Sequence, residues 1–193
     1  MKNFIEEIRW RGMVHDEMPG ISDHLDGSCR VSYTGFDPTS DSLHIGSLVP
    51  IMLLAHFQRS GHKPIVLIGG ATGMIGDPSG KSSERNLLDE KTLSKNQKAI
   101  KQQLSHFLNF DSKEKNSALI LNNFDWMSKF TLLEFIRDIG KHISVNYMMS
   151  KDSVKNRISS ESSEGMRFTE FTYQLVQGYD IIHLYRENNY TIQ

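Results

Sequence analysis

The sequence predicts an α/β fold in which helices cover both faces of a parallel β-sheet, and three observations predict it. Residues 30–36 look like a first buried strand, and short apolar runs at 64–68 and 118–121 have the length of two more. Longer segments with helical apolar spacing, at residues 43–60 and 92–108, alternate with these runs. Turn and glycine signals directly follow the first two runs. Such alternation is typical of a parallel sheet, which binds its ligands at the carboxyl ends of the strands.

The composition is that of an ordinary soluble globular protein. The 193 residues suit one domain, or one domain with a small insertion. The single cysteine, Cys29, excludes an internal disulfide and indicates a reducing compartment, which we take to be the cytoplasm. No apolar run approaches the roughly 20 residues that span a bilayer, so we expect no membrane partner. A net charge of −1 gives no sign of a nucleic-acid partner within this segment.

Residues 1–30 are expected to form an N-terminal helix and a connection. The apolar residues from Phe4 to Met13 have rough helical spacing, whereas residues 15–27 are rich in Asp, Gly, Pro and His and predict a loop. The main domain then occupies residues 31–193. Its first strand runs into a turn at Asp37-Pro38-Thr39, and the helix at 43–60 follows, with Gly61 as its stop signal.

The second strand, at 64–68, ends in a cluster of glycines between residues 69 and 76, and residues 79–89 are polar. The helix at 92–108 is expected to bury its apolar residues and to expose three lysines. The apolar residues are Leu93, Ile100, Leu104, Phe107 and Leu108, and the lysines are Lys91, Lys95 and Lys98.

Thr131 and Glu134 have the spacing of a capping box, which predicts that a helix begins there. Residues 150–164 predict a helix fragment and a loop, and residues 169–178 predict a helix. Two short apolar pieces, at 181–185 and 190–192, are ambiguous. The helix after Thr131 carries one apolar stripe, formed by Leu132, Ile136, Ile139 and Ile143.

The first segment with chemical character follows the first strand. It reads Tyr-Thr-Gly-Phe-Asp-Pro-Thr from Tyr33 to Thr39, and Leu-His-Ile-Gly-Ser follows from Leu43. We expect a helix to begin with His44 and Gly46 in its first turn, where the helix terminus favours anions and a glycine allows close approach of a ligand. An isolated His-x-Gly is more often a surface feature. The preceding Gly-Phe-Asp-Pro-Thr favours a binding site.

The second segment is the glycine-rich stretch at residues 69–82. It is not a P-loop. That motif requires a glycine four intervening residues before Gly80-Lys81-Ser82, at position 75, and this residue is Ile75. A Gly-x-Gly-x-x-Gly pattern is missing as well, which disfavours a dinucleotide site. A turn needed only for packing is the alternative.

The third segment, at residues 168–180, places Tyr173, Gln177 and Asp180 on one face of a helix, at positions i, i+4 and i+7. A phenol, an amide and a carboxylate together suit a zwitterionic ligand that bears a hydroxyl group. A partly buried helix whose tyrosine and glutamine have hydrogen-bond partners within the protein explains the spacing equally well.

In this order, the three segments resemble those of class I aminoacyl-tRNA synthetases, in the form found in bacterial tyrosyl-tRNA synthetases. The stretch at 44–47 is similar to the HIGH motif, with Ser47 where the last histidine often stands. The resemblance runs from about Phe4 to Gln193. It implies a Rossmann-like parallel sheet of the HIGH-type nucleotidyltransferase fold, incomplete at its C-terminus, with a subunit-interface insertion at about 122–165.

The resemblance also implies roles for individual residues. The catalytic set, which stabilises charge on the ATP phosphates, is His44, Thr39, Lys81 and Arg85. The ATP-binding set is Gly35, Asp37, Thr39, His44, Gly46 and Ser47. The tyrosine-binding set is Tyr33, Asp77, Tyr173, Gln177, Asp180 and Gln193, in which Tyr33 and Asp180 pair with the substrate hydroxyl. No residue is assigned to a metal, and Mg²⁺ accompanies ATP.

The activity implied is that of a tyrosine–tRNA ligase, which activates tyrosine with ATP and transfers it to the 3′ end of tRNA(Tyr). The partners implied are tyrosine, ATP, tRNA(Tyr) and a second subunit bound through about residues 126–154. Under this interpretation the chain is a fragment that lacks the KMSKS loop and the C-terminal tRNA-binding region. Two alternatives are another class I synthetase or nucleotidyltransferase, and a binding module that has lost catalysis.

Overall fold

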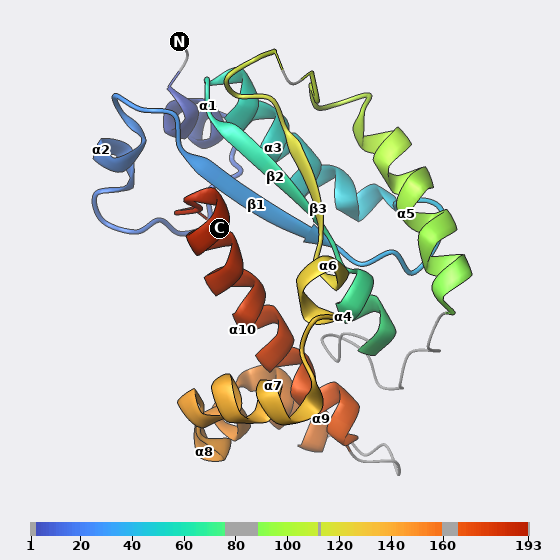
Figure 1. Ribbon diagram of the computed structural model, residues 1–193. Coiled ribbons are helices and arrows are strands. Elements are labelled where there is room, and N and C mark those ends of the chain that lie inside the picture. The colour runs from blue at the N-terminus through green and yellow to red at the C-terminus, as the bar shows by residue number, and fades with distance from the viewer. Residues whose placement is uncertain (1–2, 76–88, 112, 160–165, 193) are drawn as a thin grey trace.

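The fold is built on three parallel strands in the order β1-β2-β3, as the computed structural model shows (Figure 1). The structure describes residues 3–75, 89–111, 113–159 and 166–192. The strands are β1 (Val31–Phe36), β2 (Lys63–Ile68) and β3 (Leu119–Asn122). Val31 pairs with Lys63 and Ile65 with Leu119, so all three carboxyl ends reach one edge of the sheet. The expected strands are confirmed, with each boundary within one residue.

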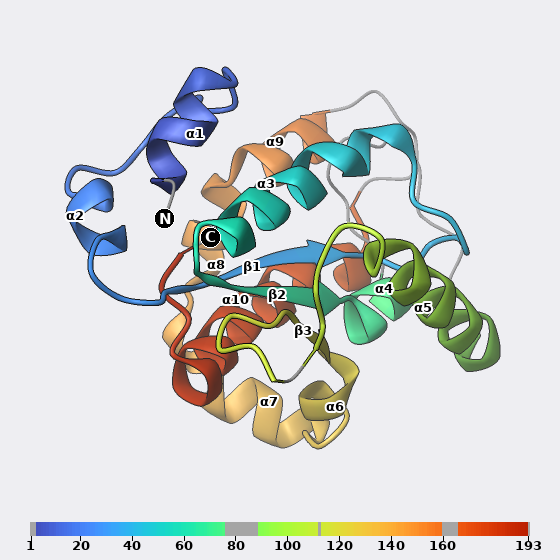
Figure 2. The ribbon, with the colours of Figure 1, turned by 90° about the horizontal axis from the view of Figure 1, so that it is seen from above.

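Helices cover both faces of the sheet, as the fold class predicts (Figure 2). Val66 and Ile68 of β2 face α3 (Leu48–Arg59) and α5 (Glu90–Leu104) in one cluster of the core. The alternate residues Ile65 and Leu67 face α6 (Phe124–Met127) and α10 (Phe168–Asn188) in a second cluster. The alternation follows from the two-residue period of a strand. Because both faces are covered, β2 is apolar from Pro64 to Ile68.

The N-terminal segment forms two helices where one was expected. α1 (Phe4–Trp10) is capped by Asn3, whose side chain accepts a hydrogen bond from the backbone N–H of Glu6. α2 (Ile21–Leu25) lies within the stretch that we expected to be a loop, and that expectation is wrong. Its Leu25 joins the α1 side chains around Phe57 of α3, so burial of apolar surface stabilises a helix that is too short to be stable alone.

The expected helix at 43–60 begins later than predicted. Ile45–Ser47 form a 3₁₀ turn (η1), and α3 begins only at Leu48. Pro50 explains the difference, because proline is tolerated in the first turn of a helix but disrupts its interior. His44 therefore caps the 3₁₀ turn from an extended conformation and does not lie within a helical turn.

The glycine cluster after β2 opens a helix of its own, α4 (Gly70–Ile75). In α5, the lysines are exposed, and four of the five apolar residues are buried as expected. Phe107 is the exception at 39% exposure; it and the buried Leu108 both lie beyond Leu104, the last residue of α5.

The capping box at Thr131 and Glu134 is confirmed at the start of α7 (Leu132–Asp138). α7 stops too early to complete the expected stripe, and the 3₁₀ turn η2 (Gly140–His142) follows. The next helices are α8 (Val145–Ser150) and α9 (Asp152–Ser159), and this helical group lies at the end of α10 away from the sheet (Figure 1).

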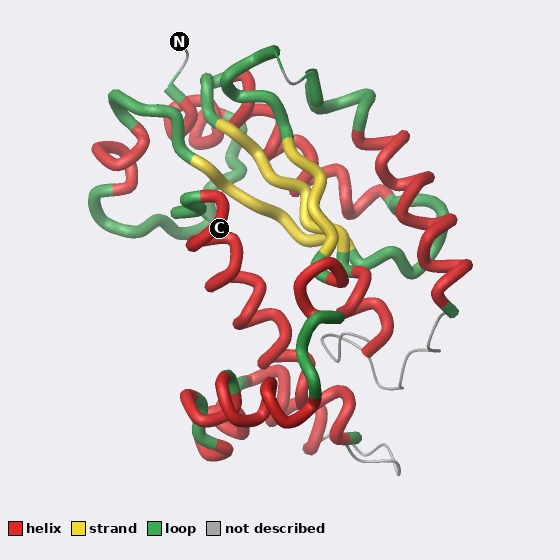
Figure 3. The backbone as a smooth tube through the Cα atoms, in the orientation of Figure 1, coloured by secondary structure: helices red, strands yellow, loops and turns green. Residues whose placement is uncertain are grey.

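The long helix α10 includes both the expected helix at 169–178 and the ambiguous piece at 181–185 (Figure 3). Asn189 ends it in the left-handed conformation, with a φ of 53°. The chain then returns to the sheet, where Ile192 forms a parallel bridge with Ser32. Among the described residues, no helix is both long and apolar enough to cross a membrane.

Candidate active site

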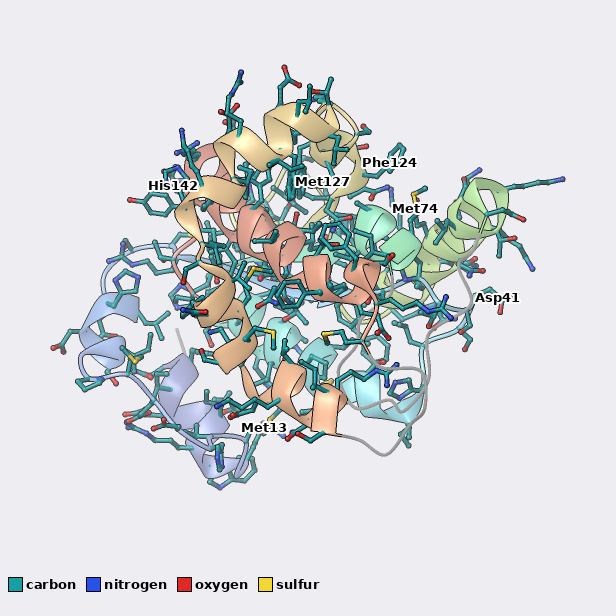
Figure 4. The ribbon with its side chains drawn as sticks, turned by 90° about the horizontal axis from the view of Figure 1, so that it is seen from below. Met13, Asp41, Met74, Phe124, Met127 and His142 are labelled. Carbon is teal, nitrogen blue, oxygen red and sulfur yellow. The ribbon has the colours of Figure 1, made fainter. Side chains whose placement is uncertain are left out.

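A cleft of about 600 Å³ lies at the carboxyl ends of β1 and β2. The end of β1, the turn up to Ser47, the start of α4 and one face of α10 line it. In Figure 4, α10 passes in front of the sheet. Asp41, in the turn after β1, lies near α5, and Lys95 of α5 donates to its carboxylate. The cleft therefore lies where a parallel sheet binds its ligands.

The cleft brings together most of the residues that the sequence singled out. Asp77, Lys81, Arg85 and Gln193 lie outside the described residues. The ten others all line the cleft: Tyr33, Gly35, Asp37, Thr39, His44, Gly46, Ser47, Tyr173, Gln177 and Asp180.

Asp180 is the most deeply buried acid of the cleft, at 2% exposure. The indole N–H of Trp126 donates to its Oδ1 at 2.8 Å, and the Asn123 amide donates to its Oδ2 at 3.0 Å. Burial raises the pKa of Asp180 to about 6, although both hydrogen bonds oppose the shift. At neutral pH the group is thus mainly a carboxylate, and lone pairs remain for a donor in the cleft.

Tyr33, on β1, lines the same cleft with a buried phenol. Its ring packs edge-to-face against Tyr190, with ring centroids 4.8 Å apart. Burial is the main cause that raises the pKa of Tyr33 to about 12, and the negative charge of Asp180 raises it in the same direction. Tyr33 therefore keeps its proton at neutral pH, so a phenolic donor and the carboxylate of Asp180 line the same cleft.

Asn123 is a site residue that sequence reasoning missed. It is 1% exposed, and its Oδ1 accepts a hydrogen bond from the N–H of Ala71 at 2.7 Å. Its amide nitrogen donates to Asp180 and also lies 3.3 Å from the Thr72 hydroxyl. The residue lies just beyond the carboxyl end of β3, so the rule that identified the ends of the first two strands could have found it.

Asp37 links the turn after β1 to two other elements. The Thr72 hydroxyl donates to its Oδ1 at 2.9 Å, and the Tyr173 hydroxyl donates to its Oδ2 at 3.4 Å. Asp37 was expected in the ATP set and Tyr173 in the tyrosine set. Their contact means that the two expected subsites share a border at this carboxylate.

His44 has a defined tautomer in the cleft. Its Nδ1 accepts a hydrogen bond from the backbone N–H of Gly46 at 3.0 Å. In the neutral ring the proton therefore lies on Nε2, which can donate to a ligand. A side chain at position 46 would overlap the imidazole, so glycine is required for this arrangement.

Replacing Gly69 by alanine is expected to destabilise the fold by about 1–3 kcal/mol. The added Cβ would overlap Asp37 Oδ1 and Thr72 Oγ1, which bond to each other. Urea unfolding monitored by circular dichroism measures the effect. Gly178→Ala on α10 is the matched control, because its Cβ meets no atom and should stabilise the helix by about 0.5–1 kcal/mol. Equal stability of Gly69→Ala and the parent would contradict the close packing.

The raised pKa of Asp180 predicts a pH dependence of stability. The pKa of about 6 exceeds the ordinary value of 3.8, so the folded chain binds this proton more tightly than the unfolded chain. The contribution of Asp180 to the free energy of unfolding should fall by about 2 kcal/mol as pH rises from about 4 to about 7, and stay level above that. Urea unfolding from pH 4 to 8 measures this contribution as the difference in the free energy of unfolding between the parent and Asp180→Asn. A difference that is constant with pH would contradict the shift.

Among the residues described, the structure gathers no group of three His, Cys, Asp or Glu side chains that could hold a metal ion. The fold and the cleft together define an α/β protein with a polar cleft at the carboxyl edge of a parallel sheet, the edge at which such folds bind ligands.

Comparison with known proteins is more specific. A model of the family "tRNA synthetases class I (W and Y)" matches residues 28–193, and the chain belongs to this family. It is 64% identical to a tyrosine–tRNA ligase of Porphyromonas gingivalis and 61% identical to one of Bacteroides fragilis, each over 191 residues. These alignments cover 99% of the chain but 44% of each relative, so the chain spans less than half the length of the curated relatives it matches.

Solved structures share the fold. A C-terminally truncated mitochondrial tyrosyl-tRNA synthetase of Aspergillus nidulans matches with a TM-score of 0.80 and 31% identity, over 96% of this chain and 54% of that one. A tryptophanyl-tRNA synthetase of Giardia lamblia matches with a TM-score of 0.62 over 90% of this chain and 40% of that one. At 15% identity, the second match supports the fold alone. The expected family and fold class are confirmed.

Proposed function

We propose that this chain forms the tyrosine- and ATP-binding part of a tyrosine–tRNA ligase. In the first step the tyrosine carboxylate attacks the α-phosphate of ATP, which gives tyrosyl-adenylate and pyrophosphate. In the second step the tyrosyl group moves to the 3′ end of tRNA(Tyr). The observation that carries the proposal is the buried carboxylate of Asp180 beside the phenol of Tyr33 in one cleft.

At the amino-acid end, the substrate hydroxyl would donate to Asp180 and accept from Tyr33. Tyr173 and Gln177, from the same face of α10, would surround the substrate ammonium together with Asp77, which lies outside the described residues. Phenylalanine in the same position would leave a buried carboxylate without its donor, which is unfavourable. The identity of the curated relatives supports tyrosine as the substrate.

At the nucleotide end, we assign the ATP to the turn between β1 and α3. The Thr39 hydroxyl and the His44 Nε2–H would donate to the phosphates, and Gly35, Asp37, Gly46 and Ser47 would line the nucleotide site. ATP would enter with Mg²⁺ as its counter-ion. Lys81 and Arg85, outside the described residues, stay predictions for the same phosphates. Catalysis here would consist of positioning and of stabilising the charge that develops on the phosphates.

ATP–pyrophosphate exchange with each amino acid tests the proposal. The assay uses a chimera in which this chain replaces the matching 44% of the Porphyromonas gingivalis relative, with that relative as the positive control. We expect exchange that depends on tyrosine. Exchange that depends on another amino acid would support a different class I synthetase. Tyrosine binding without exchange would support a binding module.

We also propose that the protein acts in the cytoplasm as a homodimer. The proposed interface is an apolar face on α7 and α8, whose side chains are 43–78% exposed. Exposed apolar side chains gathered on neighbouring helices commonly mark a protein interface. The face consists of Leu132, Leu133, Ile136, Val145, Tyr147 and Met149.

Leu133→Glu is expected to convert the dimer to a monomer, because association would bury a carboxylate without a partner. Leu133 is 78% exposed in the single chain, so the substitution should leave the fold intact. Sedimentation velocity of the chain measures the change. Trp10→Glu, at an equally exposed apolar residue on α1, is the control and should sediment like the parent. A monomeric parent would refute this interface.

A further inference from the structure

His183 stacks on the indole that holds the buried carboxylate of the cleft. The ring centroids of His183 and Trp126 lie 4.1 Å apart, and the planes meet at 22°. His183 follows Asp180 by three residues on α10, so both side chains lie on the same side of the helix. The indole N–H of Trp126 donates to Asp180 Oδ1 at 2.8 Å. The imidazole therefore lies against the face of the indole that donates this hydrogen bond, although His183 itself does not line the cleft.

The indole depends on its neighbours for its orientation. Trp126 belongs to α6, which has four residues and is too short to hold a side chain rigidly by itself. A hydrogen bond weakens steeply as its angle departs from linearity, so a tilt of the indole would weaken the bond to Asp180. The Tyr179 ring, 6.2 Å from the His183 ring, packs edge-to-face with Phe130 and extends the row of aromatic side chains.

The imidazole is suited to this place because it is neutral. Burial lowers the pKa of His183, and the charge of Lys129 lowers it further, while Glu187 opposes them. A neutral ring stacks on the indole without placing a positive charge close to Asp180. That matters because a nearby cation could compete for the carboxylate.

We propose that His183 is a positioning residue for recognition of the substrate hydroxyl. Its stacking fixes the indole of Trp126, whose N–H occupies one lone pair of Asp180 and directs the remaining ones to the phenol of tyrosine. The inference rests on the proposed function, because it concerns how the same cleft separates tyrosine from phenylalanine. His183 acts through Trp126 and does not contact the substrate.

The test compares kcat/KM for tyrosine and phenylalanine in pyrophosphate exchange by the chimera. His183→Ala removes the ring, His183→Leu keeps most of its volume, and His183→Phe keeps a neutral aromatic ring. In the Ala and Leu variants, the ratio of kcat/KM for tyrosine to that for phenylalanine should fall about threefold to tenfold, since an aromatic stack contributes energy of this order. His183→Phe should stay within about twofold of the parent. Tyr185→Ala, which removes an exposed ring from the same helix, should match the parent.

The outcomes separate this inference from the proposed function. A parent chimera without tyrosine-dependent exchange would overturn both. An active parent whose preference is unchanged in the Ala and Leu variants would overturn the inference alone. So would a His183→Phe variant that loses as much preference as His183→Ala, because stacking would then not be the cause. If circular dichroism shows that His183→Ala does not fold, the comparison of the Leu and Phe variants decides.

Discussion

Replacing Asp180 by alanine should lower the preference for tyrosine over phenylalanine by about 100-fold or more, the largest change in activity that the cleft predicts. The parent should reject phenylalanine because the buried carboxylate would then lose the substrate donor. Sites that bind a substrate hydroxyl discriminate by about 10⁴- to 10⁵-fold, a magnitude established with this class of enzyme and not deduced from the cleft. Without the carboxylate, the phenol of tyrosine has no acceptor and its advantage is lost.

Exchange kinetics of the chimera with both amino acids measure this preference, and the KM for ATP should change little. Alanine also leaves the donors of Trp126 and Asn123 without their acceptor, so the folded fraction must be measured in parallel. Asp125→Asn, at an exposed acid on α6, serves as the control. An unchanged ratio of kcat/KM values in a folded Asp180→Ala variant would refute the role of Asp180.

Arg157→Met should destabilise the chain by about 3–5 kcal/mol, the largest effect on stability that we expect. The guanidinium of Arg157, on α9, lies 3.5 Å from the carboxylate of Glu170, on α10, and both side chains are at most 5% exposed. Removing the cation leaves Glu170 as a buried negative charge that has lost the positive charge of Arg157. The backbone N–H of Arg167, which donates to the other carboxylate oxygen, cannot replace a full positive charge.

Denaturant unfolding measures the loss, and a double variant tests its cause. Arg157→Met with Glu170→Leu removes both charges and should recover most of the stability, as replacing a buried ion pair by apolar residues often does. Lys95→Met breaks the exposed pair with Asp41 and should cost less than about 1 kcal/mol. If the single and double variants were equally unstable, lost packing would explain the effect better than the unpaired charge.

The order of elements and much of the cleft could be predicted because they depend on local patterns. Short segments with buried-strand character, followed by turn and glycine signals in two of three cases, identified β1, β2 and β3 within a residue. The face formed by Tyr173, Gln177 and Asp180 follows from helical spacing alone, and the cleft brings these side chains together.

The remaining features depend on contacts that no local pattern contains. α2 is stabilised by packing of Leu25 near Phe57, more than 30 residues away in the chain. The partners of Asp180 are Trp126 on α6 and Asn123 just before it, both more than 50 residues away, so these hydrogen bonds left no signal in the sequence near Asp180. The start of α3 differs from the expected one for a local reason, because Pro50 fits the first turn of a helix but not its interior.

The continuity of α10 joins two parts of the molecule into one cooperative unit. Its 21 residues extend about 30 Å, from the return to the sheet to the helices that carry the apolar face (Figure 1). One end is anchored to α9 by the buried ion pair, and the middle supplies the carboxylate of the cleft. Opening of the whole helix would therefore expose the amides near the cleft and near the anchor together. Hydrogen exchange of both groups should then report a common free energy of opening.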